Sequence, residues 1–195
     1  MGQGKEGVTP LEIVRVDQEE IARYRDGILK VYREAFGGPP YFEGPEHFER
    51  FNASLTSHAG RPGFHCCVAR KPDGGQVVGF AYGYSGLPGG WWWDTVASAL
   101  DKESAACWLE GCFEFVELAV TPACQRKGIG KLLHNALLGD IPHRTAVLST
   151  LDADTPARRL YERMNWTTLL KGFRFPSGTT PYLIMARGLT ATNDE

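Results

Sequence analysis

The chain has 195 residues, of which 43% are hydrophobic and 23% charged, a composition typical of a soluble protein with one sizeable core. We therefore expect a single domain over residues 1–195. Its 21 lysines and arginines against 23 aspartates and glutamates give a net charge of −2. Proteins that collect on nucleic acid or anionic lipid carry a basic excess, so we expect neither as a partner.

The sequence also lacks the patterns that are typical of membrane spans and of metal sites. No run approaches the roughly 20 apolar residues that span a bilayer, and the first seven residues do not resemble a signal peptide, so we expect a cytoplasmic protein. The five cysteines form no C-x-x-C pair and the five histidines no H-x-x-x-H pair. These spacings argue against a disulfide framework and against a metal cofactor, and most thiols should be buried.

The first half of the chain predicts a strand, two helices and a β-hairpin. Gly37-Gly38-Pro39-Pro40 ends the first helical pattern, and Asp73-Gly74 is a strong hairpin turn signal between two strand-like runs. The predicted elements are a strand over 11–16, a helix over 21–35, a short helix over 46–55, and strands over 64–70 and 76–84.

A long connection follows the hairpin. Residues 85–111 carry Trp91-Trp92-Trp93 and a weakly helical stretch over 94–109. A connection of this length in a compact domain is usually functional or mobile. Residues 112–120 then predict another strand.

The second half alternates strand and helix. Thr155 is a typical N-cap and Pro156 a typical first helical residue, while Asn165 suits the left-handed position after a helix. We expect an α/β (α+β) fold, a mixed sheet with helices on both faces. The predicted elements are a helix over 128–138, a strand over 145–151, a helix ending at Asn165, and strands over 166–175 and 181–187.

The most informative window runs from Glu117 to Lys131. A strand leads into a loop with Gly128 and Gly130, and the loop opens an amphipathic helix whose free N–H groups and positive end suit an anion. Arg126 and Lys127 add positive charge. Such glycines also serve close helix–sheet packing, so the loop alone leaves both interpretations open.

Two other kinds of phosphate-binding loop are excluded by the residues at particular positions. A Walker A loop needs glycine at position 125 and serine or threonine at 132, where the chain has Gln125 and Leu132. A dinucleotide fingerprint needs a third glycine at 133, which is Leu133.

Gln125-x-x-Gly128-x-Gly130 resembles the Q/R-x-x-G-x-G/A signature of the GNAT superfamily of acyl-CoA-dependent N-acyltransferases. Asp154-x-x-Ala157-x-x-Leu160-Tyr161 resembles the N-x-x-A-x-x-L-Y signature of the same family, although Asp154 stands where asparagine is usual. The likeness covers roughly residues 77–175. It implies a mixed, mostly antiparallel sheet of six to seven strands.

The resemblance also implies an activity. It is transfer of an acetyl group from acetyl-CoA to a primary amine of a small molecule or peptide, by direct attack in a ternary complex. The alternative is a non-catalytic acyl-CoA-binding regulatory module. A homodimer through the closing strands is a further implication of the family. The implied cofactor contacts are Leu118, Ala119, Val120, Gln125, Arg126, Lys127, Gly128, Ile129, Gly130, Lys131, Asp154 and Ala157.

Three residues are candidates for catalysis. The resemblance places the thioester beside Leu118, whose N–H could polarise the acyl carbonyl, and Tyr161 where it could protonate the leaving thiolate. The alternative for Tyr161 is an aromatic ring that only fills the core. Glu114 and Glu117 are candidate bases; strict alternation puts them on opposite faces of their strand unless a bulge intervenes, and we favour Glu117.

The acceptor side is less defined. Trp91-Trp92-Trp93, with Tyr82 and Tyr84, could form an aromatic wall for an amine. The tryptophans could instead anchor the long connection to the core. The sequence does not choose an acceptor, an acyl-chain preference beyond acetyl or an oligomeric state.

Overall fold

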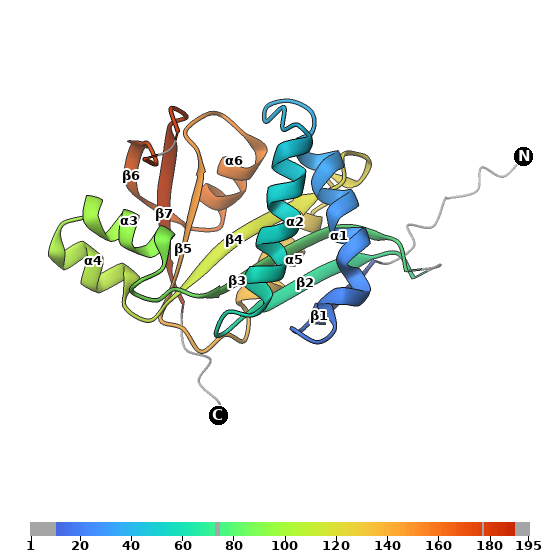
Figure 1. Cartoon of the computed structure of the whole chain (residues 1–195), viewed down its shortest axis with the longest axis horizontal. Coiled ribbons are helices and arrows are strands. Elements are labelled where there is room, and N and C mark those ends of the chain that lie inside the picture. Colours follow the sequence, from blue (N-terminus) through green and yellow to red (C-terminus); the bar gives the residue numbers. More distant parts are fainter. Residues whose placement is uncertain (1–10, 73–74, 177, 190–195) are drawn as a thin grey trace, which may run out of the picture.

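A computed structural model describes residues 11–72, 75–176 and 178–189, in which the strands form one seven-stranded sheet (Figure 1). The strands are β1 (Glu12–Val16), β2 (His65–Arg70), β3 (Val77–Ser85), β4 (Cys112–Val120), β5 (Thr145–Leu151), β6 (Thr167–Phe173) and β7 (Tyr182–Gly188). Their order in the sheet is β1-β2-β3-β4-β5-β7-β6. Only β4 and β5 pair in parallel, which confirms the predicted mixed, mostly antiparallel sheet.

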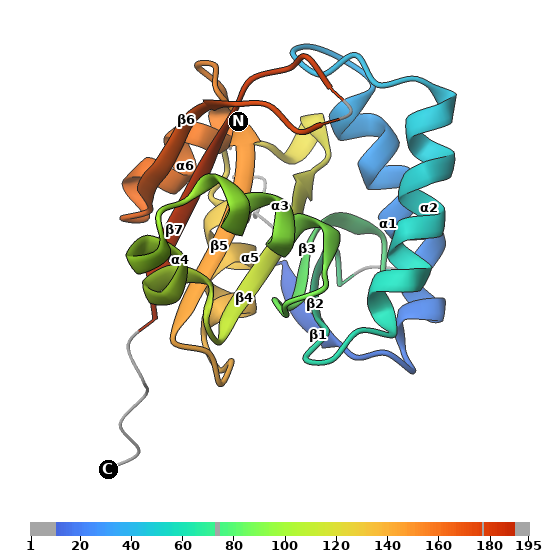
Figure 2. The ribbon, with the colours of Figure 1, turned by 60° about the vertical axis from the view of Figure 1, so that its left-hand side comes forward.

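Helices cover both faces of the sheet, as predicted. They are α1 (Ile21–Phe36), α2 (Pro45–Ala59), α3 (Trp91–Ala99), α4 (Lys102–Leu109), α5 (Ile129–Leu138) and α6 (Pro156–Arg163), with a short 3₁₀ turn over Pro122–Cys124. The helices α1 and α2 share one buried cluster with the β1–β4 side of the sheet, and α3 and α4 share another with β5 and β7 (Figure 2). The opposite face carries α5 and α6.

The helix boundaries follow the local sequence. The hydroxyl of Thr155 accepts a hydrogen bond from the N–H of Arg158 at 3.1 Å, which caps α6 ahead of Pro156. Asn165 has a φ of +60°, the left-handed conformation expected after that helix. The hairpin between β2 and β3 is antiparallel as predicted, although its turn residues Asp73 and Gly74 lie outside the described residues.

The long connection differs from the prediction of one weak helix over 94–109. It forms two helices, because Leu100 is extended and Asp101 starts α4 by accepting a hydrogen bond from the N–H of Ser104 at 2.8 Å. The tryptophans begin α3 rather than lying in a loop. Trp93 donates to the carbonyl of Leu109 at 3.1 Å and packs against the core, so the anchoring interpretation holds for it.

The remaining boundaries need small corrections. The helix α2 is longer than the predicted 46–55, with Leu55 and Ala59 buried along its face. Cys66, Cys67 and Cys112 are buried thiols, as expected of most of the cysteines. None of the helices in the described part of the chain is both long and apolar enough to cross a membrane.

Candidate active site

The strands β4 and β5 separate after a short parallel ladder. They pair only through Cys112, Phe113 and Glu114, and Figure 2 shows them diverging beyond that point. The N–H of Leu118 is 3.3 Å from a carboxylate oxygen of the preceding Glu117 and donates to it, rather than to β3. This places a backbone donor and a carboxylate together on the side of β4 that β5 has left.

A β-bulge in β4 changes which way its glutamates face. Tyr82 of β3 pairs with Glu117 and Tyr84 with Glu114, while Val116 is the extra residue between them. Because Tyr82 and Tyr84 are two residues apart, their side chains share a face, and so do those of their partners. Strict alternation would put Glu114 and Glu117 on opposite faces, and the bulge is the exception that we allowed for. Both face the α1–α2 side of the sheet.

The Glu117 carboxyl group is unusually hard to ionise. Burial, with the charge of Glu43 as a smaller cause, raises its pKa to about 8, while the N–H of Leu118 opposes the shift. Neither Glu117 nor Glu43 forms an ion pair with a lysine or arginine in the described residues. A group with this pKa exchanges its proton near neutral pH, as a general base requires.

Glu114 is the more deeply buried of the two glutamates. Its residue is 4% exposed, and Oε1 is buried without a hydrogen-bond partner in the described structure. Burial raises its pKa to about 7, offset in part by the Tyr84 hydroxyl and the Arg61 guanidinium. The Arg61 guanidinium also lies over the Tyr84 ring at 4.5 Å. Glu114 therefore has a cationic neighbour, unlike Glu117.

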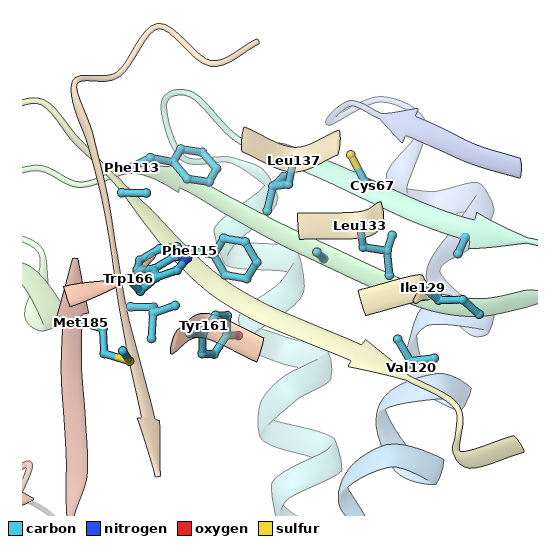
Figure 3. Close-up of a cluster of buried hydrophobic side chains, with 14 of the residues drawn as sticks. Cys67, Phe113, Phe115, Val120, Ile129, Leu133, Leu137, Tyr161, Trp166 and Met185 are labelled. Atoms are coloured by element: carbon cyan, nitrogen blue, oxygen red, sulfur yellow. The ribbon is translucent and has the colours of Figure 1, made fainter. Parts of the chain in front are cut away.

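Tyr161 lies in the core between α6 and the sheet. Its ring centroid is 6.1 Å from that of Phe115 and 5.7 Å from that of Trp166 (Figure 3). Burial raises the pKa of its hydroxyl well above the ordinary value, and the charge of Glu117 raises it further. The ring thus fills the core, as one interpretation expected, and the hydroxyl stays protonated within electrostatic reach of Glu117.

The glycine loop joins β4 to α5 in a conformation that glycine makes possible. Gln125 donates from Nε2 to the carbonyl of Val120 at 2.9 Å, which folds the loop back onto its strand. Arg126 and Gly128 have φ values of +62° and +83°, so the chain turns sharply before α5 begins. The first N–H groups of α5 have no carbonyl partner within the helix and form a ready anion site.

Gly130 lies where three elements meet. A Cβ built there would be 3.4 Å from Leu160 of α6 and 3.7 Å from Leu118 of β4, which are ordinary contact distances. The position is therefore close to α6 and β4, yet a methyl group fits without displacing either. Both interpretations of the loop glycines, packing and ligand approach, stay compatible with this geometry.

The other predicted contact residues divide by exposure. The side chain of Ile129 is buried, which leaves its backbone to meet a ligand, whereas Asp154 is exposed and paired with Arg159. Leu118 and Ala157 are partly buried against the core. The predicted contacts that are buried are Ala119, Val120 and Ile129, and those that are exposed are Gln125, Arg126, Lys127, Gly128, Lys131 and Asp154.

Sequence reasoning missed the tyrosines around Glu117 and the second carboxylate beside it. The Tyr32 hydroxyl donates to Glu43 at 2.7 Å. The pKa of Tyr41 is raised to about 12 by burial and by both Glu117 and Glu43, and that of Tyr182 is raised by the same three causes. The run Tyr41-Phe42-Glu43 shows no periodicity that reveals contact with β4, so only the fold identifies these residues.

The model of the acetyltransferase (GNAT) family matches residues 26–166. The chain belongs to this family. Its members use acetyl-CoA, and no group of three or more His, Cys, Asp or Glu side chains in the described residues is arranged to hold a metal ion.

Individual proteins similar to this GNAT chain include one relative in sequence and two solved structures. The GCN5-like protein acetyltransferase Rv2170 of Mycobacterium tuberculosis is 32% identical over 129 residues, which are 62% of this chain and 63% of that protein. A GNAT-family protein from Desulfovibrio desulfuricans has a TM-score of 0.65 at 18% identity, covering 93% of this chain and 100% of that one. The yncA protein of Salmonella typhimurium, solved with its cofactor acetyl-CoA, has a TM-score of 0.56 at 15% identity, covering 93% and 95%. These two structures establish the shared GNAT fold.

The raised pKa of Glu117 predicts a pH-dependent stability. The folded state binds the Glu117 proton more tightly than the unfolded chain does. The resulting stabilisation of the folded state is complete below pH 4.5, the ordinary pKa of the group, and is lost as the pH rises through about 8. We expect Glu117→Gln to flatten the fall in unfolding free energy over this window, by at most about 1.4 kcal/mol per pH unit. Denaturant unfolding at several pH values measures this.

The matched control for this GNAT chain is Glu49→Gln, which changes an exposed glutamate on α2. Its pH profile should overlay that of the parent protein. If the Glu117→Gln profile also overlays the parent, the carboxyl group is not buried in the way described.

Proposed function

We propose that this chain is an acetyl-CoA-dependent N-acetyltransferase that acts on a primary amine by direct attack in a ternary complex. The observation that carries the proposal is the separation of β4 from β5, with the Leu118 N–H and the Glu117 carboxylate on the open side. Family membership supports acyl transfer, and the glycine loop that follows β4 supports an anionic donor.

The residues present fit such a donor. In our proposal the backbone over Gln125–Lys131 holds the pyrophosphate, because a left-handed Gly128 and the start of α5 direct N–H groups outward. The pantetheine arm pairs with the backbone of Leu118, Ala119 and Val120, with Asp154 and Ala157 contributing from the start of α6. Acetyl-CoA supplies the acetyl group as a thioester.

Each catalytic candidate then has one task. Glu117 accepts a proton from the acceptor ammonium, which exposes the nitrogen lone pair for attack. The Leu118 N–H donates to the acyl oxygen as negative charge grows there. Tyr161 donates its proton to the departing sulfur and recovers one from the new amide nitrogen, so the net proton released is the one that Glu117 took.

Glu114 is the other candidate base. The bulge puts it on the same face as Glu117, and its pKa of about 7 also suits proton transfer. Glu117 is favoured because it lies directly beside the Leu118 N–H, whereas Glu114 lies where β4 still pairs with β5. Four points stay predictions: which carboxylate acts, the cytoplasmic location, the single domain and the homodimer.

The acceptor belongs to small molecules or peptides. The curated relative in Mycobacterium tuberculosis is named a protein acetyltransferase, which supports a peptide amine, but the alignment spans 63% of that protein. Of the three tryptophans that could form an aromatic wall for the acceptor, Trp91 is still a candidate. Trp91 is 58% exposed and stacks on Phe175 at 5.2 Å.

The experiment that tests the function measures free CoA. The purified chain is incubated with labelled acetyl-CoA and a panel of amines, and the label is traced into an amide product. We expect CoA release that requires an amine and matches the amide formed. Binding of acetyl-CoA without amine-dependent release would instead support the non-catalytic acyl-CoA-binding module.

The cofactor loop is tested by Gly130→Val. Alanine is the other residue that the family signature allows at this position, whereas the two further methyl groups of valine obstruct a ligand that approaches the backbone. We expect acetyl-CoA affinity to fall by about ten- to a hundredfold, equivalent to losing one charge-assisted hydrogen bond. Calorimetry measures the affinity, and Gly130→Ala, whose methyl group fits without displacing its neighbours, is the control and should keep the parental affinity. Unchanged affinity in a folded Gly130→Val protein would assign the glycine to packing.

The role of the Tyr161 hydroxyl is tested by Tyr161→Phe, which keeps the ring packed against Phe115 and Trp166. Loss of a general acid should lower kcat by about 10²–10⁴-fold while acetyl-CoA affinity changes little. Single-turnover kinetics measure the chemical step. Tyr24→Phe, at a buried tyrosine on α1, is the control and should leave kcat unchanged. A Tyr161→Phe enzyme with the parental rate would show that the hydroxyl gives no proton to the sulfur.

A further inference from the structure

The strand β5 forms the far side of the gap that opens beyond the parallel ladder. The ladder ends where Glu114 pairs with Val147, and partners in a ladder share a face of the sheet. Two residues further along β5, Ser149 shares the face of Val147. Since Glu114 and Glu117 face the same side, Ser149 lies across the gap from Glu117 on one face of the sheet.

An indole from α3 is fixed to this part of β5. The Nε1–H of Trp92 donates to the hydroxyl of Ser149 at 3.4 Å, and the Trp92 ring packs against the buried cluster that includes Val147 and Ile184. Figure 2 shows α3 in front of β4 and β5. The start of α3 is thereby held on the β5 side of the gap, on the face that carries Glu117.

Three aromatic rings adjoin this point and form what we call the aromatic row: Trp91, Phe175 and Tyr182. Trp91 stacks on Phe175 with ring centroids 5.2 Å apart, and Phe175 packs edge-on against Tyr182 at 5.3 Å. Tyr182 pairs with Leu151, two residues beyond Ser149 on β5, so its side chain has the same face as that of Ser149. The aromatic row therefore lies along the gap, opposite Glu117.

Trp91 is not needed to anchor α3. Trp92 and Trp93 pack against the core, whereas Trp91 is 58% exposed and belongs to none of the buried clusters in the described part of the chain. Phe175 and Tyr182 are each partly exposed beside it. Contiguous exposed aromatic surface next to a reactive group is typical of a ligand contact.

The aromatic row favours a ring over an aliphatic chain. Aromatic pairs gain stabilisation from offset-stacked and edge-to-face contacts in addition to the burial of apolar area. Neighbouring rings of the row meet at 28° and at 71°, so a further ring placed against Trp91 finds an arrangement that already combines both geometries. None of the three side chains carries a charge at neutral pH, so the row does not select a second ionic group.

We propose that the acceptor is an arylalkylamine, whose ring packs against Trp91 while its amine faces Glu117 across the gap. This inference rests on the proposed function and adds to it a substrate class and a specificity-determining residue. Phe175 is a positioning residue, because it acts by stacking on Trp91.

The test compares phenylethylamine with cyclohexylethylamine at saturating acetyl-CoA. The two amines have the same carbon skeleton and differ in the aromaticity of the ring. The measured quantity is the ratio of their kcat/KM values. We expect the parent protein to favour phenylethylamine by about three- to tenfold, and Trp91→Leu to lower this ratio to about one through the KM for phenylethylamine, since leucine keeps an apolar contact but offers no ring.

Three further variants separate ring contact from structure. Trp91→Phe keeps an aromatic ring and should retain most of the preference. Phe175→Leu removes the ring that holds Trp91 and should lower the ratio in the same direction as Trp91→Leu, but less. Leu132→Ala is the control, because it removes an exposed apolar side chain from α5, on the opposite face of the sheet, and it should leave the ratio unchanged.

The outcomes are distinguishable. Three results overturn the arylalkylamine assignment while leaving acetyl transfer intact: a Trp91→Leu enzyme with the parental ratio, a parent protein that does not favour phenylethylamine over cyclohexylethylamine, or a parent protein that favours a lysine peptide over both. Absence of CoA release with every amine overturns the proposed function, and the arylalkylamine assignment falls with it.

Discussion

The point at which β4 leaves β5 is the constraint on which the rest of the site depends. A parallel ladder that continued past Glu114 would satisfy the outer N–H and C=O groups of β4 internally and leave nothing for a ligand. The rings of Phe115, Tyr161 and Trp166 pack edge to face and hold α6 against the sheet at this place. Trp166 also donates to His134 at 2.9 Å. Aromatic packing therefore stabilises the separated strands, while the strand edge beyond them stays available.

The bulge at Val116 supplies the second half of the arrangement. With regular pairing, Glu114 would share a face with Val116 instead of Glu117, and only one glutamate could face α1 and α2. One additional residue turns the end of β4 so that Glu117, beside the Leu118 N–H, shares the face of Tyr82. The same local irregularity thus aligns a proton acceptor with a backbone donor.

How well a feature can be predicted from the sequence depends on whether local or long-range interactions determine it. Elements fixed by local patterns were predicted closely: β4 and β5 have the predicted bounds, and Thr155 caps α6. The split of residues 94–109 into two helices depends on one extended residue, Leu100, which no periodicity marks. The family signatures predicted the position of the glycine loop, because those residues are consecutive in the chain.

The surroundings of Glu117 could not be predicted from the sequence, because they depend on packing between distant segments. A bulge depends on how two strands fit together, and the effect of the Glu43 charge on Glu117 depends on how a helical hairpin packs on a sheet. The residues between 41 and 63 showed no pattern that indicated a role. Tyr182 reaches the same place from the other end of the chain, across a separation that only the folded topology closes.

Burial of the Glu117 carboxyl group lowers the stability of the folded state above its ordinary pKa. A pKa of about 8 for Glu117 means that the protein holds a proton there which water would remove at neutral pH. Replacing the group by an apolar residue would relieve the strain of burying it, and Glu43 could be turned to solvent. Instead Tyr32 fixes Glu43 in place, which maintains the repulsion. In the proposed reaction, an acceptor ammonium beside Glu117 lowers the pKa of that carboxyl group and so favours the charged base when an amine is present to be deprotonated. The binding of the acceptor would thereby activate the residue that prepares it for attack.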